Sequence, residues 1–404
     1  MSKPSKPLAG FKVLEMAQIM AGPVAGQMLA DLGAEVIKVE KMPGGDDTRS
    51  YAEPRINGVS APFLMLNRGK RGLALNLKHP RGREVLFELV RKSDALIENF
   101  RKGTLEKFSA GYEDLRKINP RLIYCAISGY GRTGPYADKG GFDLIAQGFS
   151  GLMSITGEPG RPPVKPGTPV ADINAGILAV NGIMAAHIHC LKTGEGQLVE
   201  TSLMEAAMHQ THWHAGIYFA TGQSPEPTGS AHVLTAPYQA FRTADGHINI
   251  GGANATNWQR VCHELGHPEW ASDQRFKENA DRMANREALV QAMESVLETN
   301  GTEYWVARFD AAGVPAGPVH QIGQAVQHPQ ALAREMVVQT KHPDAGEVRS
   351  IGNPVKLSAS PGSSDRPAPR FGEHTRDVLE EFGFAAADID ELISAGVVHQ
   401  GETA

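Results

Sequence analysis

The sequence predicts an α/β protein in which a large domain built on a parallel sheet is followed by a smaller α+β domain. Strand and helix patterns alternate through residues 11–131, which is typical of a parallel sheet. The texture changes after Gln-Ser-Pro-Glu-Pro-Thr-Gly at residues 223–229, a segment rich in turn formers. The 404 residues, of which 41% are hydrophobic and 21% charged, suit about two globular domains.

The first strand–helix–strand pattern carries the start of this sheet. We predict strands over residues 11–16 and 34–40, separated by a helix over residues 23–32. The turn before the helix contains Gly22 and Gly26 but not the three-glycine dinucleotide fingerprint. Because Glu40 stands where a ribose-binding acid is expected, an NAD enzyme stays a weak alternative.

A basic turn follows at Asn67-Arg68-Gly69-Lys70-Arg71, ahead of a short strand and a helix predicted over residues 80–92. Such a turn suits phosphate groups, although solvated loop lysines and arginines are the more frequent explanation of a charge run. Both interpretations stay open from the residues alone.

The alternation continues with a strand at residues 95–98, a helix at 105–117 and a strand at 122–127. In open parallel sheets, ligands sit beyond the carboxyl ends of the strands. The loops expected at that edge are residues 20–22, 41, 78, 99–102 and 128–131. Ser128 is not expected to be a hydrolase nucleophile, because Ala126 replaces the first glycine of the nucleophile elbow.

The segment from Gly167 to Gly176 places one carboxylate, Asp172, between a Pro/Gly-rich loop and a long apolar helix running to about Leu191. An aspartate at a helix start is commonly an N-cap, and the segment taken alone favours that interpretation. Its apolar neighbours also suit a carboxylate nucleophile that attacks an activated acyl group, so the context in the sequence must decide. Just upstream, Asp143 is predicted to cap a helix that runs to about Ile155.

The second half predicts a β-hairpin from strands at residues 238–242 and 247–250, joined by Ala244-Asp245-Gly246. Helices are expected near residues 286–299, 302–312, 375–382 and 388–395, with a strand near Val348.

Composition restricts the class of protein. A net charge of -5 gives no global attraction for nucleic acid or anionic membrane. Cys125, Cys190 and Cys262 lie far apart, which favours a reducing, cytoplasmic location and no structural zinc. His209 and His212 fit a metal less well than ordinary packing. The polar leader at residues 1–7 lacks an apolar core, and we expect no membrane-spanning run.

Many ordered segments together resemble the family III CoA-transferases, which include formyl-CoA and carnitine CoA-transferases and the α-methylacyl-CoA racemases. The resemblance runs almost end to end. The segments that carry it are Ala21-Gly22-Pro23, residues 31–40, Gly45-Asp46-Asp47-Thr48-Arg49, Asn67-Arg68, Leu75-Asn76-Leu77-Lys78, Glu98-Asn99-Phe100, Gly129-Tyr130-Gly131, Gly134-Pro135, Asp172, residues 192–197, 313–318 and 372–375, and Val378-Leu379.

The resemblance implies a Rossmann-like large domain over residues 1–222, a linker at 223–232, a small α+β domain at 233–325 and a return segment at 326–404. It also implies a homodimer of two ring-shaped subunits threaded through each other.

By position, Asp172 matches the catalytic aspartate of the family. The positions that the resemblance assigns to CoA are Met20, Ala21, Lys41, Leu75, Asn76, Leu77, Lys78, Asn99, Phe100, Lys107 and Phe142. At Lys41 and Lys107 the family often has arginine, so the charge is kept and the bidentate geometry is lost. The segment Gly251, Gly252, Ala253 and Asn254 is a candidate lid, or simply a strand end followed by a helix cap.

The implied reaction moves CoA from an acyl-CoA to a small carboxylic acid through an aspartyl anhydride and an aspartyl-CoA thioester. CoA is then a substrate, and no metal or permanently bound cofactor is expected. Residues 232–241 resemble the branch that uses succinyl-CoA with dicarboxylates. A racemase is the nearest alternative, but Phe142 stands where racemases have a proton-transferring histidine. A catalytically silent CoA-binding protein is a more remote one.

Overall fold

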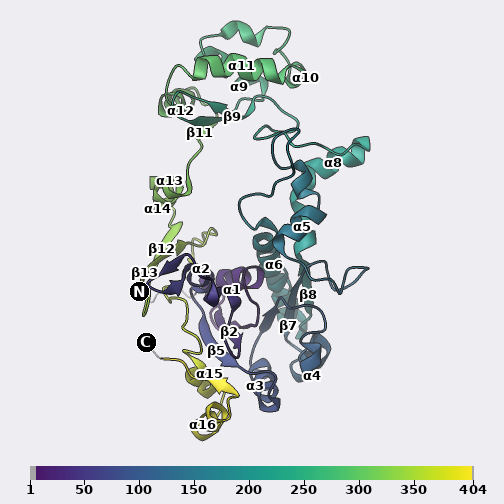
Figure 1. Cartoon of the computed structure of the whole chain (residues 1–404), viewed down its shortest axis with the longest axis vertical. Helices are drawn as coiled ribbons and strands as arrows, with labels where there is room; N and C mark the ends of the chain where they lie inside the picture. The colour runs from purple at the N-terminus through teal and green to yellow at the C-terminus, as the bar shows by residue number, and fades with distance from the viewer. Residues whose placement is uncertain (1–5, 403–404) are drawn as a thin grey trace. The chain divides into compact units, whose positions relative to one another are not determined.

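The computed structural model describes residues 6–402, so most of the predicted leader and the last two residues lie outside the described part. The chain separates into two compact units (Figure 1). Unit 1 contains Met1–Leu152, Pro166–Thr211 and Pro329–Ala404, and unit 2 contains Met153–Lys165 and His212–His328. Unit 1 is therefore assembled from three separate stretches of the chain.

Unit 1 is built on a seven-stranded sheet in the order β14-β5-β2-β1-β6-β7-β8. Its strands are β1 (Lys12–Glu15), β2 (Glu35–Lys41), β5 (Arg71–Leu75), β6 (Ala95–Glu98), β7 (Ile123–Ser128), β8 (Leu198–Ser202) and β14 (Val398–His399). Every pairing is parallel except that of β14 with β5. The predicted parallel sheet is confirmed. Because the strand order reverses between β1 and β6, the switch point of the sheet lies there.

Helices cover both faces of this sheet. The helices of unit 1 are α1 (Ala21–Asp31), α2 (Ala61–Asn67), α3 (Pro80–Arg91), α4 (Tyr112–Ile118), α5 (Asp143–Phe149), α6 (Val170–Thr193), α7 (Leu203–Met208), α14 (Pro329–Ala333), α15 (Thr375–Glu381) and α16 (Ala386–Ser394). Successive strand residues point to opposite faces of the sheet and belong to two hydrophobic cores. Val13 packs with α1, α6 and α7, whereas Leu14 packs with α3, α4, α15 and α16. Burial on both faces explains the nearly continuous apolar strands.

Helix α6 corrects one expectation of the sequence. Residues 173–191 carry no Asp, Glu, Lys or Arg, and by length and composition this helix reaches what a membrane span requires. Its buried face consists largely of alanine and packs against α1 in the core of unit 1. Gly176 permits that close approach, because a Cβ there would lie 2.6 Å from the carbonyl oxygen of Ala21.

Two predicted helices are shorter than expected. The helix predicted over residues 105–117 divides into a 3-10 turn at Glu106–Phe108 and α4, because Ser109 takes a positive φ of 54° between them. The helix predicted from Asp143 to Ile155 ends at Phe149 and is followed by a separate turn at Leu152–Ile155, with Gly151 at φ 84° between them. Strands β8 and β14 were not predicted from the sequence.

Unit 2 has its own small sheet and core. Its elements are α8 (His212–Thr221), β9 (Tyr238–Arg242), β10 (His247–Gly251), α9 (Ala255–Glu264), α10 (Asn279–Ala284), α11 (Arg286–Leu297), α12 (Thr302–Ala311), β11 (Ala316–Pro318) and α13 (Ile322–Gln327). The predicted hairpin of β9 and β10 is confirmed. Separately, β12 (Val337–His342) and β13 (Gly346–Ile351) form an antiparallel ribbon in unit 1, where the sequence predicted one strand.

Candidate active site

Asp172 lies inside the first turn of α6 rather than at its cap. The helix begins at Val170 and its N-cap is Pro169, so the N-cap interpretation of Asp172 is wrong. The capping acceptor is instead the carboxylate of Asp143, whose Oδ1 accepts from the N–H of Ala171 at 2.9 Å and of Asp172 at 3.3 Å. Asp143 was predicted to cap its own helix; Phe142 occupies that position, and Asp143 is the first residue of α5.

The carboxylate of Asp172 has an unusual electrostatic setting. Within residues 6–402 no group donates a hydrogen bond to its side-chain oxygens. Burial and, to a smaller extent, the negative charge of Asp143 raise the pKa of Asp172 to about 7. Near neutral pH the side chain is therefore divided between a proton-bearing form and a poorly stabilised anion, as expected of a reactive carboxylate.

Asp172 lines a cavity of about 280 Å³ at the switch point of the sheet. The loops after β1, β6 and β7 supply most of its wall. Of the residues assigned to the site from sequence, this cavity brings together Met20, Ala21, Asn99, Phe100, Phe142 and Asp172. The basic side chains of Arg101, Lys102 and Lys139 also line it. Their only sequence signal was their place in loops that follow strands or precede α5.

A second cavity of about 290 Å³ is lined by the other group of assigned residues. These are Lys41, Leu75, Asn76, Leu77 and Lys78. Gln18 and Phe100 line both cavities, so the two adjoin at the carboxyl ends of β1 and β6. Most of the second cavity's wall is apolar, with Lys41 and Lys78 as its two basic side chains. Lys107 lines neither cavity.

The candidate lid belongs to unit 2, whereas the residues that line the two cavities belong to unit 1. Gly251 is the last residue of β10, and Asn254 is the N-cap of α9, where its side chain accepts from the N–H of Asn257 at 2.8 Å. A strand end followed by a cap therefore describes this segment locally, and its motion as a lid stays a prediction. Within residues 6–402, no cluster of three or more His, Cys, Asp or Glu side chains is placed to hold a metal.

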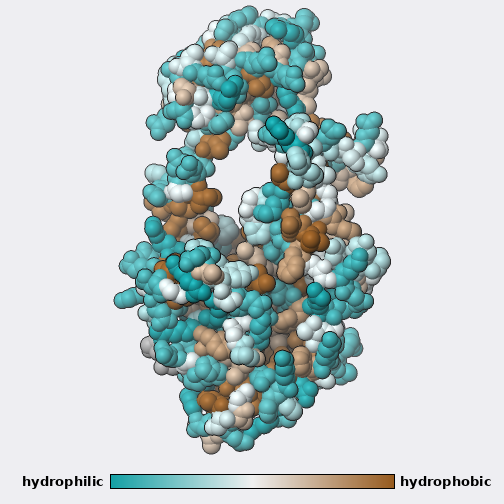
Figure 2. Space-filling model, viewed as in Figure 1, coloured by the Kyte–Doolittle hydropathy of each residue, from teal (hydrophilic) through white to brown (hydrophobic). Residues whose placement is uncertain are grey.

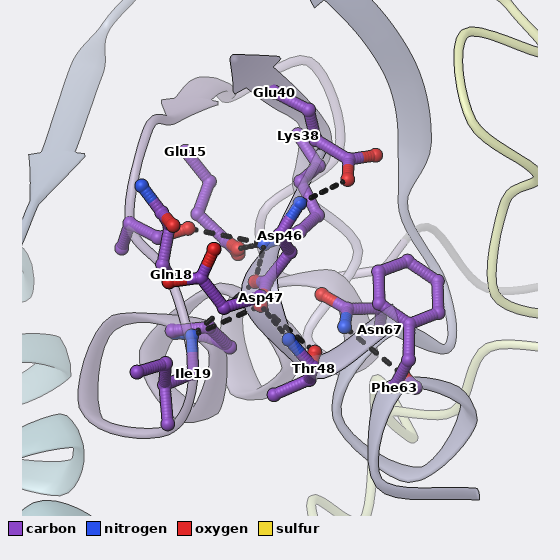
Figure 3. A network of polar contacts seen from close by, with 12 residues as sticks. Glu15, Gln18, Ile19, Lys38, Glu40, Asp46, Asp47, Thr48, Phe63 and Asn67 are labelled. Carbon is purple, nitrogen blue, oxygen red and sulfur yellow. Dashed lines mark hydrogen bonds and ion pairs between the residues drawn. The ribbon is translucent and has the colours of Figure 1, made fainter. Parts of the chain in front are cut away.

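The loop Gln18–Met20, which contributes to the first cavity, is fixed by hydrogen bonds from both sides. Gln18 donates its N–H to Asn99 Oδ1 at 2.9 Å, and Asn99 Nδ2 donates to the Gln18 carbonyl at 2.8 Å. Ile19 has φ 69°, which strains a β-branched residue. Its N–H donates at 3.3 Å to both oxygens of Asp46 (Figure 3). No sequence pattern indicated this strained link.

Asp46 belongs to a buried ionic network beneath the loop (Figure 3). Lys38 Nζ lies 2.9 Å from Asp46 and 3.0 Å from Glu15, and Lys70 Nζ lies 2.6 Å from the other oxygen of Glu15. Burial alone would raise the pKa of Asp46, but Lys38 and the hydrogen bonds from Thr48 lower it to about 2. This carboxylate is therefore a permanent anion in the folded protein.

The small residues of α1 make room for this network. A Cβ on Gly26 would lie 1.7 Å from Glu15 Oε2. The glycine at this position thus serves close packing of a carboxylate rather than a dinucleotide pyrophosphate. Glu40, considered above as a ribose ligand, accepts two hydrogen bonds of 2.7 Å from Arg49 and one of 2.9 Å from the N–H of Asp46. Its side chain is therefore already engaged.

The basic turn at residues 67–71 is buried, so neither a solvated loop nor a phosphate-binding turn describes it. Arg68 is 1% exposed and forms a two-pronged pair with Asp31 at 2.5 and 2.7 Å. Lys70 is fully buried against Glu15. Both cations are neutralised by carboxylates within unit 1, and their role is structural.

Glu98 fixes the neighbouring loop that carries Asn99 and Phe100. Its Oε2 accepts from the N–H of Phe100 at 2.7 Å, and its Oε1 accepts from Arg132 at 2.8 Å. Burial raises the pKa of Glu98 to about 7, against the opposing effects of the Phe100 N–H and of Arg132. Phe100 is thereby held where it lines both cavities.

Three comparisons with known proteins agree. The sequence profile of CoA-transferase family III matches residues 8–375. Human succinyl-CoA:glutarate CoA-transferase is 38% identical over 399 residues, which cover 98% of this chain and 91% of that protein. Succinate–glutarate CoA-transferase of Agrobacterium fabrum is 40% identical over 382 residues, covering 93% and 95%. The crystal structure of a CAIB/BAIF family protein from Brucella suis superposes with a TM-score of 0.84 at 38% identity, covering 94% of this chain and all of that one.

Proposed function

We propose that this chain, which belongs to CoA-transferase family III, moves CoA from a succinyl-CoA-like donor to a free dicarboxylate, with Asp172 as covalent nucleophile. The observation that carries the proposal is the setting of Asp172: it is partly buried in a cavity wall, no group among residues 6–402 donates a hydrogen bond to its carboxylate, and its pKa is raised to about 7. A carboxylate so poorly stabilised gains most from forming a neutral acyl bond.

The proposed reaction needs no external proton. A carboxylate oxygen of Asp172 attacks the donor thioester carbonyl, the C–S bond breaks, and CoA leaves as the thiolate. The thiolate then attacks the Asp172 carbonyl of the resulting anhydride, which releases the donor acid and leaves an aspartyl-CoA thioester. The acceptor carboxylate attacks this thioester, and the expelled thiolate takes the acceptor acyl group from the second anhydride. Asp172 is regenerated as a carboxylate.

A dicarboxylate acceptor suits the charges of the cavity. Arg101, Lys102 and Lys139 line the same cavity as Asp172, so a second carboxylate of the substrate would find cations near the nucleophile. The two relatives described above are named for succinate and glutarate. We expect glutarate to be accepted with a kcat/KM at least tenfold above that of valerate, its five-carbon monocarboxylate counterpart, since unpaired cations penalise the apolar end.

The test of the covalent step is trapping with hydroxylamine during turnover with succinyl-CoA. Mass spectrometry should find a hydroxamate on Asp172. Asp172→Ala should lose at least a thousandfold in kcat. Asp388→Asn, which removes a carboxylate from the first turn of α16 outside both cavities, is the matched control and should retain activity. An active Asp172→Ala variant, or turnover without modification at Asp172, would exclude the mechanism.

Racemisation is the alternative that the cavity disfavours. Phe142, 70% exposed, lines the cavity with Asp172 and offers no group that can exchange a proton. We therefore expect a 2-methylacyl-CoA in deuterated buffer to show negligible α-deuteration. Rapid deuteration with inversion, and no exchange of CoA into added free acids, would reverse the assignment.

We also propose that the working form is a cytoplasmic homodimer with interlocked subunits. In its support, α5 exposes Leu144, Ile145 and Phe149, which form a hydrophobic patch over that helix (Figure 2). The three cysteines are free and buried, as suits a reducing compartment. An active monomer in sedimentation experiments at working concentration would contradict the dimer.

A further inference from the structure

We propose that Asp143 is the positioning residue of the nucleophile: it takes up the amide donors at the start of α6 and so keeps the carboxylate of Asp172 free of hydrogen bonds. The inference rests on the proposed role of Asp172 and extends it. It is drawn from the contacts of Asp143, a residue to which the resemblance assigned no part in the chemistry.

Every backbone N–H of the first turn of α6 has an acceptor other than the side chain of Asp172. A helix start leaves N–H groups without intrahelical partners, and these groups normally stabilise a carboxylate in the first turn. Here the N–H of Val170 donates to the Thr168 carbonyl, and the N–H of Ile173 donates to the Pro169 carbonyl. The N–H groups of Ala171 and Asp172 both donate to Asp143. None is left for the side chain of Asp172.

Asp143 is itself held in place by a hydrogen bond within α5. Its Oδ2 accepts from Gln147 Nε2 at 2.5 Å, so its two oxygens have separate fixed partners. Gln147 is fully buried one turn further along α5. The approach to α5 is equally constrained, because a Cβ on Gly141 would lie 2.7 Å from the Cα of Gly129. Such packing fixes the direction in which Asp143 enters the first turn of α6.

The other charged side chains around α6 are either paired with groups other than Asp172 or positive. Glu205 on α7 accepts a hydrogen bond from Ser202, and Glu200 on β8 accepts from the N–H of Arg132. Asp31 at the end of α1 pairs with Arg68. The remaining charged groups of the cavity are the cations Arg101, Lys102 and Lys139. Asp143 is thus the negative charge that acts on Asp172 together with burial.

This arrangement favours the chemical step. While Asp172 is an anion, it faces the like charge of Asp143 without donors of its own. As its oxygen bonds to the acyl carbon, the negative charge passes to the leaving CoA thiolate and the repulsion decreases. An interaction that is less unfavourable in the transition state than in the ground state lowers the barrier.

The test replaces the charge of Asp143 while keeping its acceptor. Asp143→Asn retains an oxygen for the amides of α6, and Gln147 can turn its amide to meet the new Nδ2. Carbodiimide coupling reacts with protonated carboxyls, so its pH dependence at Asp172, followed by mass spectrometry without CoA, reports the ionisation of that side chain directly. We expect the midpoint of labelling to fall by about one pH unit in Asp143→Asn. Asp388→Asn should leave the midpoint unchanged.

A second variant separates the cap from the charge. Asp143→Ala removes both, which loosens the first turn, and kcat/KM should fall about a hundredfold, whereas Asp143→Asn should stay within about tenfold of the unmodified protein. Asp143→Ser, a neutral acceptor, replaces the asparagine variant if that variant does not fold. Thermal melting confirms folding in each case.

Two results would overturn the inference. One is a labelling midpoint in Asp143→Asn or Asp143→Ser that equals that of the unmodified protein, and the other is an unchanged kcat/KM in Asp143→Ala. The labelling experiment needs no turnover. If no hydroxamate formed on Asp172 in the unmodified protein, the proposed function would fail, while the midpoint would still decide the role of Asp143.

Discussion

Two aspartates at the same end of the sheet have opposite environments. Asp46 receives hydrogen bonds from Thr48 at 2.9 and 2.8 Å, lies 2.9 Å from Lys38, and takes the N–H of Ile19. Asp172 receives none from residues 6–402, and its closest charged perturber is another carboxylate. The pKa of Asp46 is lowered to about 2, and that of Asp172 is raised to about 7.

The supply of hydrogen-bond donors, rather than burial, decides whether each of these buried carboxylates is structural or reactive. Asp46 is the more deeply buried of the two, at 1% exposure, yet it stays ionised because each of its oxygens is paired. The two are also connected: Asp46 holds the strained Ile19, and the adjoining Met20 lines the cavity of Asp172. The carboxylate of Asp46, which has hydrogen-bond donors, therefore supports the loop beside the carboxylate of Asp172, which receives none from residues 6–402.

The largest expected effect comes from removing the carboxylate of Asp46, the aspartate that has hydrogen-bond donors. Asp46→Ala leaves Lys38 buried with Glu15 as its one carboxylate partner, shared with Lys70. We expect the free energy of unfolding to fall by about 3–5 kcal/mol, because an uncompensated buried charge is left behind. Urea denaturation measures it. A loss below about 1 kcal/mol would show that the ionic network contributes little to stability and that the donors around Asp46 do not distinguish it from Asp172.

Removing the charge of Asp172 should have the opposite effect and raise the free energy of unfolding. The folded pKa of Asp172, about 7, lies above its ordinary value of 3.8, so its contribution to stability is fully present below pH 4 and is lost as the pH rises through 7. The side chain of the Asp172→Asn variant does not ionise. At pH 8 its free energy of unfolding, measured by urea denaturation, should therefore exceed that of the unmodified protein by about 2 kcal/mol after allowance for partial exposure. The gain should shrink toward zero between pH 7 and pH 4. A gain independent of pH would point to a different cause.

The smallest effect concerns an exposed pair with similar geometry. Lys41 Nζ lies 2.5 Å from Asp47, but both side chains are about half exposed. Lys41→Ala should change the free energy of unfolding by less than about 0.5 kcal/mol. Since Lys41 lines the second cavity, CoA affinity should fall severalfold in titration calorimetry, more steeply at low salt. A stability loss comparable to that of Asp46→Ala would show that exposure does not separate these pairs.

Local patterns were sufficient to predict much of unit 1. Alternating strands and helices predicted the parallel sheet, and β6 was placed to the residue, because buried apolar runs are local signals. Asp172 and most of the residues that the family resemblance assigned to CoA line the two cavities. Lys107, which the resemblance also assigned to CoA, lines neither cavity.

Long-range contacts could not be predicted in the same way. The acceptor that caps α6 is Asp143, 28 residues before Ala171, and its own neighbourhood predicted only a cap of α5. The burial of Arg68 and Lys70 depends on Asp31 and Glu15, each from a different element. Both cations look like loop residues until the fold brings those carboxylates to them. The division of two predicted helices followed from positive φ at Ser109 and Gly151, which the helical pattern around them concealed.

The last strand of the sheet has a consequence for how the protein is made. β14 pairs with β5 through Val398 and Leu75, and the N–H of Asn76 donates to the carbonyl of Val397 at 2.9 Å. Leu75 and Asn76 line the second cavity. During synthesis at roughly 5–20 residues per second, β5 leaves the ribosome many seconds before its antiparallel neighbour exists. A nascent chain can therefore collapse around the central strands, but it cannot complete this cavity wall until residues 397–399 have been synthesised.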